Sequence, residues 1–539
     1  MNYDKEAIRI CSEQKRLKTS RKNWETYWEY ISQFVIPNHS DFITKRVKGD
    51  MTRSNQIFDA TAVRSARLLS TSIIGAIFTG KWFGLKLRGK DNQSDEWSSW
   101  LEQVTDSMLA AFEDSNFLVQ IGQDIQGMVA FGTSGLSVED ESDDGIFQRL
   151  IFRDHHLTTF VFDEGADGTP DRIYREVKMS PEAALNKYHG DENISREIIA
   201  DFRDKMEKKI STPISFVEAI EPTTLHSAAD REQGKYKITL IYKNEMQLME
   251  ESYAPELPML VSRWDKITGD VYGWSPAMTA LPDIITMNEV KRLELGAWEK
   301  NILPAKEIVA GTLMNGKLNR GVNGVTIVNR PNAINNIDEP FSFQNTMVKA
   351  EELRDGIKSS FHEQELILPD RNHDTAYEVR IRYDLMQRLL GATFGRIKTE
   401  KLQPLINRVF RIMLDGGAFP DLPQSATESD ITVEYLSPLA KSQRAAEVEA
   451  TMQFSQWVMQ MAQMKPNVVM ALDEHQAGSI LADGLGVPTL VWKDKETFDA
   501  EIQQQQEAMQ QQQQQQQEQE RVLKGVNGVE EDEGQEPTS

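Results

Sequence analysis

The longest helical pattern in the chain, residues 375–415, constrains the fold more than any other feature. Its apolar residues keep three- and four-residue spacing from Leu385 to Met413, as one face of a long helix does. Pro404 lies inside this pattern, where its ring removes a backbone hydrogen bond and crowds the preceding turn. The sequence therefore predicts one long helix with a kink at Pro404.

Other helices are predicted on either side of a β-rich region. Apolar spacing, caps and prolines predict helices at Trp24 to Phe34, from a cap at Asp59 to about Ile77, at Trp97 to Glu113, at Phe117 to Phe131, from Pro276 to about Asn301, at 346–363 and at 441–464. Between them, residues 135–265 contain seven β-like runs separated by turn residues, with short helices expected at 181–188 and 195–209. One further strand is expected from Trp82 to Leu87. The predicted fold class is mostly α with a β-rich part (α+β).

The chain is strongly acidic, with a formal net charge of −23 over 539 residues. Proteins that hold nucleic acid tightly usually carry a basic surface, because they gain affinity by displacing counterions from phosphates. If this chain meets DNA, we expect it to do so without adhering.

Cysteine content and hydropathy limit the class of protein further. The single cysteine, Cys11, excludes a disulfide framework within the chain and zinc sites built on cysteine pairs, and it agrees with assembly in a reducing cytoplasm. The N-terminal residues are charged, so we expect no secretory signal. No run approaches the roughly 18–20 apolar residues of a membrane-spanning helix.

Four motifs resemble catalytic or ligand-binding sequences, and each lacks a required element. Residues 75–81 have the spacing of a phosphate-binding loop, but a helix is expected before them and Trp82 replaces the Ser or Thr that binds Mg²⁺. Residues 362–366 lack the second histidine of a zinc-protease helix, residues 132–135 lack the spacing of a nucleophile elbow, and residues 163–168 lack the ligand pattern of a calcium loop. We expect a turn at 132–135, a solvated hairpin tip at 163–168, and no catalytic, metal-binding or cofactor-binding residues.

The order of the predicted elements resembles that of the portal proteins, or head-to-tail connectors, of short-tailed, T7-like bacteriophages. The residues that carry the resemblance are Tyr272–Pro276, Ala280–Ile284, Asn288, Thr375–Arg380, Leu390–Gly391, Leu402–Arg408, Tyr435–Ala440 and Gln443. The patterns from Trp24 to Pro37 and from Asp59 to Gly84 also fit, so that the resemblance covers about residues 5–495. Trp274 stands where the family often has a polar or basic residue, and the glutamine-rich run is unusual for it.

The resemblance implies a non-enzymatic ring, commonly a dodecamer, at one vertex of a viral capsid, through which double-stranded DNA is packaged and ejected. It implies a wing at 1–275 (helical 1–134, β-rich 135–265), stem helices at 276–302 and 346–363, a clip at 303–345, a channel loop at 364–374, a long wing-to-crown helix and following strand at 375–440, a crown at 441–502, and a Gln-rich, acidic tail at 503–539. The implied partners are the terminase large subunit, a tail adaptor, and the major capsid and scaffolding proteins. No cofactor and no membrane are implied, and the location is the virion after assembly in the host cytoplasm.

Two sets of residues are candidates for contact with DNA. The channel-loop residues are Gln364, Glu365, Leu366, Ile367, Leu368, Pro369, Asp370, Arg371, Asn372 and His373, and the possible channel-lining basic residues are Lys291, Arg292, Lys300, Lys349, Arg354 and Lys358. An acidic lining would repel phosphates and let a duplex slide, while sparse basic rings would guide it by weak, salt-screened contacts. The basic residues could equally lie on a solvated helix face, and the loop could be an ordinary helix connection.

Two alternative functions stay open on the sequence alone. Residues 75–81 suggest an ATP-dependent DNA packaging enzyme, which nucleotide-binding calorimetry would reveal. The helices and the glutamine-rich tail suggest a capsid-associated adaptor that forms no ring, which imaging of the purified protein would reveal.

Overall fold

A computed structural model of the chain describes residues 3–37, 42–44, 54–78, 81–85, 95–143, 146–190, 194–208, 212–314, 316–319, 325–337, 343–366, 391, 393–421, 450–461, 477–478 and 481. The chain forms two compact units, one of residues 1–82 and 106–419 and one of residues 83–105 and 420–539. In the second unit, Trp97 packs edge-on against Trp100, and the Trp100 indole donates a hydrogen bond to the Pro420 carbonyl at 3.1 Å.

The helices that precede the sheets each carry an apolar stripe. They are α1 (Tyr3–Ser20), α2 (Lys22–Phe34), α3 (Thr61–Ile77), α4 (Asp95–Glu113) and α5 (Phe117–Phe131), with a 3₁₀ turn, η1 (Ser54–Gln56), before α3. Trp28 and Ile31 of α2 are fully buried because they lie on the same face of that helix. The N-cap of α3 is Ala60, one residue after the expected Asp59, and Asp59 accepts a hydrogen bond from the Thr61 amide at 2.9 Å.

Two antiparallel sheets follow. The three-stranded sheet has the order β2-β1-β8 and consists of β1 (Thr133–Asp143), β2 (Ile146–His155) and β8 (Met259–Arg263). The five-stranded sheet runs β3-β4-β5-β6-β7 and consists of β3 (Phe160–Glu164), β4 (Pro170–Met179), β5 (Ile214–Pro222), β6 (Tyr236–Tyr242) and β7 (Gln247–Ala254). Short turns join β1 to β2, β3 to β4 and β6 to β7, which helps explain why apolar runs and turn residues located most of the strands.

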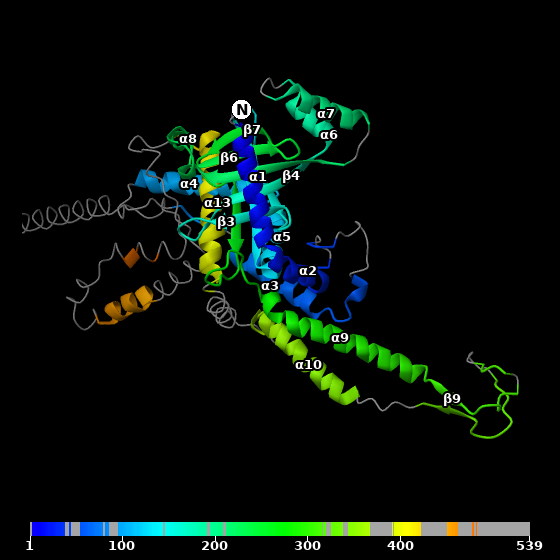
Figure 1. Cartoon of the computed structure of the whole chain (residues 1–539). Coiled ribbons are helices and arrows are strands. Elements are labelled where there is room, and N and C mark those ends of the chain that lie inside the picture. Colours follow the sequence, from blue (N-terminus) through cyan, green and yellow to red (C-terminus); the bar gives the residue numbers. More distant parts are fainter. Residues whose placement is uncertain are drawn as a thin grey trace, which may run out of the picture. The chain divides into compact units, whose positions relative to one another are not determined.

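Helices cover both faces of the five-stranded sheet because consecutive residues of its central strands, which point to opposite faces, are both apolar. On one face, α6 (Pro181–Tyr188) and α7 (Arg196–Glu207) pack against a cluster that includes Phe216 and Tyr242. On the other face, α1 packs against a cluster that includes Val217 and Ile241 (Figure 1). Two short elements, η2 (Thr223–Leu225) and α8 (Ala228–Gln233), connect β5 to β6.

A pair of helices follows the sheets. The chain runs through α9 (Pro276–Ile302), the short strands β9 (Lys306–Ile308) and β10 (Ile334–Asn336), α10 (Phe343–Ser360) and α11 (Glu363–Leu366). Helices α9 and α10 lie side by side, and the two short strands lie between them in sequence (Figure 1). Gly356 of α10 faces α9 closely, because a Cβ atom there would lie 3.2 Å from Asp283 Oδ2.

The long helix predicted at 375–415 is interrupted. Residues 393–397 are α-helical, η3 (Lys398–Leu402) is a π-helical turn, and α13 (Gln403–Asp415) is α-helical again. The interruption lies immediately before Pro404, as the sequence indicated. Residues 375–390 and residue 392 lie outside the described residues.

The structure confirms a mixed α+β fold and corrects several predicted elements. Residues 82–85 form no strand, although one was expected from Trp82 to Leu87. The helix expected at 346–363 ends at Ser360, where the chain turns before α11. Strand β7 was missed because its polar sequence, QLMEESYA, lacks a β-like run. Of the helix expected at 441–464, residues 450–461 are described and helical.

Candidate functional site

Ser275 and Pro276 position the N-terminus of α9. Ser275 caps the helix, since its Oγ accepts a hydrogen bond from the Met278 amide at 3.0 Å. The same Oγ donates to the Ala130 carbonyl at 2.6 Å, near the end of α5. Pro276 follows at the first helical position, where its missing N–H costs nothing. One side chain thus both starts α9 and fixes it to the core.

Two glycines allow this approach. Gly132 ends α5 with a φ of +76°, and a Cβ atom there would lie 2.2 Å from the Gly273 carbonyl oxygen. A Cβ atom on Gly273 would lie 2.1 Å from the Gly132 carbonyl oxygen. The turn predicted at 132–135 is confined to Gly132, because β1 begins at Thr133 directly after this glycine. The two glycines let the backbones at residues 132 and 273 lie in contact. Trp274, which follows Gly273, packs against Trp24 and Tyr27 of α2.

Helices α9 and α10 also hold the segment before α3. The Asn288 amide accepts a hydrogen bond from the Phe58 amide at 2.7 Å and donates to the Gln56 carbonyl at 3.1 Å. Arg354 of α10 pairs with Asp59 at 2.8 Å. Burial opposes ionisation of Asp59, but hydrogen bonds from Thr61 and Arg354 outweigh it and lower its pKa below the ordinary value. The base of the helix pair is therefore clamped from both helices.

Beyond this base, large apolar side chains of α9 and α10 lie in solvent. The buried residues of α9 all lie between Pro276 and Met287. Farther along, the exposed apolar residues of α9 and α10 are Leu293, Leu295, Trp298, Ile302, Met347 and Val348. Leu293 is 55% exposed and Trp298 is 53% exposed. Leu295, Trp298 and Ile302 share one face of α9 by their spacing, and exposed apolar residues gathered on one face are typical of a surface that another protein covers.

Four of the six candidate channel-lining basic residues pair with carboxylates. The pairs are Lys291 with Glu294 at 2.7 Å, Arg292 with Glu289 at 2.6 Å, Lys349 with Glu352 at 2.9 Å, and Arg354 with Asp59. Lys358 is half-buried and makes no ion pair with another described residue, and Lys300 is exposed near the end of α9. Helices α9 and α10 together carry six basic and seven acidic side chains. The pair therefore presents little net positive charge.

The candidate channel loop is described only at its start. Gln364, Glu365 and Leu366 belong to α11, while Ile367, Leu368, Pro369, Asp370, Arg371, Asn372 and His373 lie outside the described residues. Glu363 accepts a hydrogen bond from Ser65 of α3, which fixes the beginning of the segment. His362 has a positive φ of 54°, so residues 362–366 do not continue α10 as a zinc-protease helix would.

Arg263 joins three parts of the chain at the end of β8. It is 1% exposed and pairs with Glu400 of the π-helical turn at 2.5 Å. It also pairs with Glu164 and donates to the carbonyls of Gly168 and Val271 at 2.8 and 3.2 Å. The hairpin tip predicted to be solvated at 163–168 is therefore partly held by Arg263, while Val271 belongs to the loop that enters α9.

A second buried pair lies next to the first. Lys401 is 1% exposed and Asp124 of α5 is fully buried, and the two form an ion pair, with Ser134 accepting a further hydrogen bond from Lys401 at 2.8 Å. Burial and the negative charge of Asp124 raise the pKa of the nearby Asp154 to about 7, although Lys401 opposes this. Sequence reasoning missed this group. The sequence feature that could have revealed this group is a charged residue inside an apolar helical pattern, as at Asp124 in α5 and at Lys401 before Leu402.

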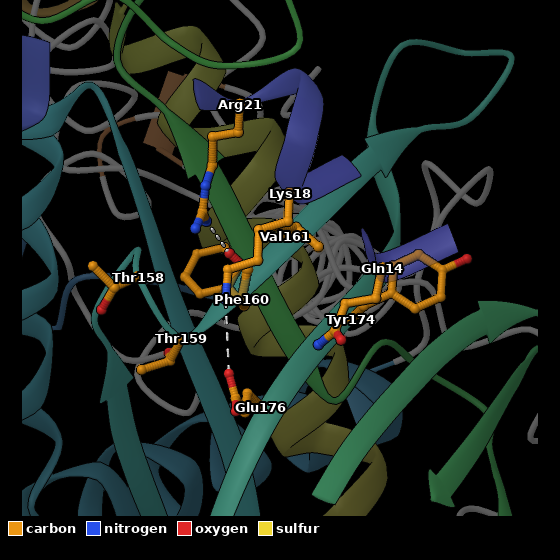
Figure 2. Close-up of a pocket in the computed structure, with 9 residues that line it drawn as sticks. All are labelled: Gln14, Lys18, Arg21, Thr158, Thr159, Phe160, Val161, Tyr174 and Glu176. Carbon is orange, nitrogen blue, oxygen red and sulfur yellow. Dashed lines mark hydrogen bonds and ion pairs between the residues drawn. The ribbon is translucent and has the colours of Figure 1, made fainter. Parts of the chain in front are cut away.

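One polar pocket lies where the end of α1 meets β3 and β4, lined among others by Lys18, Arg21 and Glu176 (Figure 2). Arg21 donates to the Leu157 and Phe160 carbonyls at 2.8 and 2.6 Å. Glu176 lies 3.8 Å from Lys18 and 3.2 Å from Lys243. Because these charged groups already have partners within the chain, the pocket is better suited to holding α1 than to binding a ligand.

The motifs set aside in the sequence have ordinary structural roles. Residues 75–77 belong to α3, and Lys81 pairs with Asp106 at 2.6 Å. Among the described residues, no group of three or more His, Cys, Asp or Glu side chains is placed to hold a metal ion. No helix in the described part of the chain is long and apolar enough to cross a bilayer.

In the described part of the chain, a partly buried ion pair and hydrogen bonds fix the base of a helix pair whose outer part exposes apolar side chains. The model of the bacteriophage head to tail connecting protein family matches residues 9–492. The chain belongs to that family, and the resemblance found in its sequence is confirmed.

Two relatives match along most of their length. The chain is 25% identical over 494 residues to a probable portal protein of Bordetella phage BPP-1, covering 88% of this chain and 87% of the relative. It is 23% identical over 508 residues to the portal protein of Salmonella phage epsilon15, covering 90% of this chain and 89% of the relative.

Proposed function

We propose that copies of this chain close into a ring that forms the portal of a bacteriophage capsid, through which double-stranded DNA is packaged and ejected. The proposal is supported by membership of the head-to-tail connecting family and by the two relatives named as portal proteins. It is a structural role, and we propose that the chain has no enzymatic activity of its own.

The observation that carries the ring is the exposed apolar surface of the outer part of α9 and α10. A lone subunit leaves Leu293, Trp298 and Met347 in water, and burying each such side chain stabilises an assembly by about 1.5–3 kcal/mol. We propose that a neighbouring copy covers this surface. Because the contact joins different faces of two copies, its rotation must close to give a ring.

In this ring, α9 and α10 are the two stem helices within 276–302 and 346–363, and residues 303–345 form the clip. Residues 364–374 are the channel loop, 1–275 the wing, 375–440 the long helix and following strand, 441–502 the crown and 503–539 the tail. The clip and neighbouring surfaces receive the terminase large subunit during packaging and a tail adaptor afterwards. The capsid and scaffolding proteins surround the wing, and assembly takes place in the host cytoplasm before the ring becomes part of the virion.

The charges of the chain support a channel in which DNA slides more than a surface that binds DNA tightly. Most candidate basic residues of the stem are neutralised by a carboxylate within 3 Å, so a duplex passing the stem would meet weak, salt-screened forces. The net charge of −23 adds a general repulsion of phosphates.

Negative-stain electron microscopy of the purified full chain tests the proposal. We expect rings with a central hole, and we expect Leu293→Glu with Trp298→Glu to reduce the ring fraction at least tenfold, because two charges would enter an apolar interface. Leu225→Glu, a leucine of 60% exposure far from α9 in sequence, serves as the control and should leave rings unchanged. A wild-type protein that stays a lone subunit under assembly conditions contradicts the proposal.

A further inference from the structure

The π-helical turn η3 is held by ion pairs on two sides. Glu400 faces Arg263 of β8, accepting hydrogen bonds from its backbone amide at 2.9 Å and from its guanidinium. Lys401, the next residue, pairs with Asp124 of α5 and with Ser134 of β1. Glu400 is 6% exposed and Lys401 is 1% exposed, so both charges are committed to the core.

A π-helical turn contains one residue more than an α-helical turn, because each amide donates to the carbonyl five residues back instead of four. The Gln403 amide donates to the Lys398 carbonyl, five residues back, and not to Thr399 as in an α-helix. If the turn became α-helical with all of its residues retained, everything before it would rotate by about 100° relative to α13. The turn is therefore a place where the helix has two possible registers.

Two physical causes could select the π register. Pro404 has no N–H, so the Glu400 carbonyl lacks its usual donor in an α-helix. The ion pairs provide the other cause, because an α-register would carry Glu400 or Lys401 away from its buried partner and leave a charge without compensation. Leaving one partner of a buried ion pair alone costs more free energy than the loss of one backbone hydrogen bond.

We propose that residues 398–402 are a two-register joint, set to the π register by the Glu400–Arg263 and Lys401–Asp124 ion pairs. The joint links two parts of the molecule, since Arg263 also holds the Val271 carbonyl in the loop that enters α9 and the hairpin tip at Glu164 and Gly168. A displacement at the base of α9 would weaken the grip on Glu400 and release the helix before the joint. The use of this link during DNA transit rests on the proposed portal function, whereas the register of the turn does not.

Spin-label distances on the full chain test the joint. Cys11 is the only cysteine, so Cys11→Ser gives a background without thiols. One label at Gly391→Cys lies before the turn and another at Asp415→Cys lies after it, each measured against a label at Ser252→Cys on β7, and all three positions are exposed. Labelled chains are diluted with unlabelled ones, so that the distance within a chain is read whether or not rings form. Failure of the ring and failure of the joint are therefore distinguishable.

Deletion of the exposed Thr399 removes the extra residue, so that an α-helical turn keeps the residues before it in the wild-type phase, and this variant gives the reference distance for the set joint. We expect Lys401→Met with Asp124→Asn to move the 391–252 distance away from this reference, by about 5 Å or more, while the 415–252 distance stays the same. An unchanged 391–252 distance in the folded double variant overturns the proposal.

Pro404→Ala separates the two causes and keeps the test decisive if the double variant does not fold. With both ion pairs intact, we expect Pro404→Ala to keep the wild-type 391–252 distance. A shift of that distance by about 5 Å or more from the wild-type value would show that the proline alone selects the register, and the proposal would be wrong.

Discussion

At the scale of single residues, the chain places several charges where water cannot reach them. Arg263, Asp124 and Lys401 are each at most 1% exposed, and each has an opposite charge as partner. Burial lowers the pKa of Arg263, but hydrogen bonds and the charge of Glu400 outweigh it and raise the pKa above its ordinary value. Such pairs fix one arrangement of the surrounding elements, because any other arrangement leaves a bare buried charge.

We expect Arg263→Met to be among the most destabilising single changes in the chain. It leaves Glu400 buried without a partner, at a cost of about 3–5 kcal/mol. Arg263→Met combined with Glu400→Gln removes both charges and should recover part of this loss. Melting temperatures from differential scanning calorimetry give the order, and Arg411→Met, which breaks an exposed pair with Asp415, is the control with little expected effect. A double variant less stable than the sum of the two single changes would contradict this account.

Asp154 makes stability depend on pH near neutrality. Its pKa is raised to about 7 in the folded chain, so its contribution is fully present below its ordinary pKa of 3.8 and is lost as the pH rises through 7. We expect Asp154→Asn to raise the melting temperature relative to wild type at pH 8, by roughly 2 °C or more, and to change it less at pH 5. Asp114→Asn, at an exposed carboxylate, controls for the general effect of removing a charge. An equal effect of Asp154→Asn at both pH values would refute the assignment.

At the scale of elements, α1 is attached to the five-stranded sheet by a polar network. Arg9 pairs with Glu221 at 2.6 Å, and Tyr174 donates to the same carboxylate at 2.6 Å. Burial opposes ionisation of Glu221, but hydrogen bonds from His226, Arg9 and Tyr174 outweigh it and lower its pKa to about 2. Glu6 of α1 adds a contact to Lys237 at 3.3 Å, and Lys237 also pairs with Glu251.

We expect acid to detach α1 before the sheet unfolds. A depressed pKa means that Glu221 stabilises the fold above its ordinary pKa of 4.5 and that this contribution is lost as the pH falls from 4.5 to 2. Glu221→Gln at pH 7 should lower the hydrogen-exchange protection of α1 amides roughly 10-fold or more, as loss of charged hydrogen bonds does. Arg16→Ala removes an exposed pair with Glu13 on the same helix and a longer one with Asp163 of β3 at 3.4 Å, and it should change the protection little because Arg16 is exposed. Equal protection in the two variants would show that the network does not hold α1.

The sequence located elements better than it located contacts. Phe117–Phe131 and Pro181–Tyr188 were predicted to the residue, because apolar spacing and caps are local signals. Strand β7 was missed because its own residues lack a β-like apolar pattern. It is a strand because it pairs with β6. The charges that meet at the π turn could not be paired from sequence, because 277 positions separate Asp124 from Lys401. The six candidate basic residues of α9 and α10 were named, but the carboxylates three residues away that pair with three of them were not considered.

At the scale of the whole molecule, membership of the family and the ion-paired basic residues of α9 and α10 both favour a channel that does not itself drive DNA. A nucleotide-driven motor would need a phosphate-binding loop between a strand and a helix, whereas residues 75–77 end a helix and residues 82–85 form no strand. We expect isothermal titration calorimetry with ATP and Mg²⁺ to show no binding to the full chain. Measurable binding that is lost in Lys81→Ala would revive the enzymatic alternative.

The ion pairs of α9 and α10 lead to a more specific prediction, which concerns the salt dependence of DNA binding. Glu289→Gln, Glu294→Gln and Glu352→Gln together leave Arg292, Lys291 and Lys349 without their carboxylates. If α9 and α10 line the channel, the slope of log affinity for duplex DNA against log salt should become more negative by about 1 for each freed cation that reaches a phosphate. The control, Glu182→Gln with Glu197→Gln and Glu207→Gln on α6 and α7, changes the net charge equally and should leave that slope near the wild-type value. Equal slopes for the two triple variants would mean that the stem pairs face away from DNA and that only the overall charge of the ring acts on it.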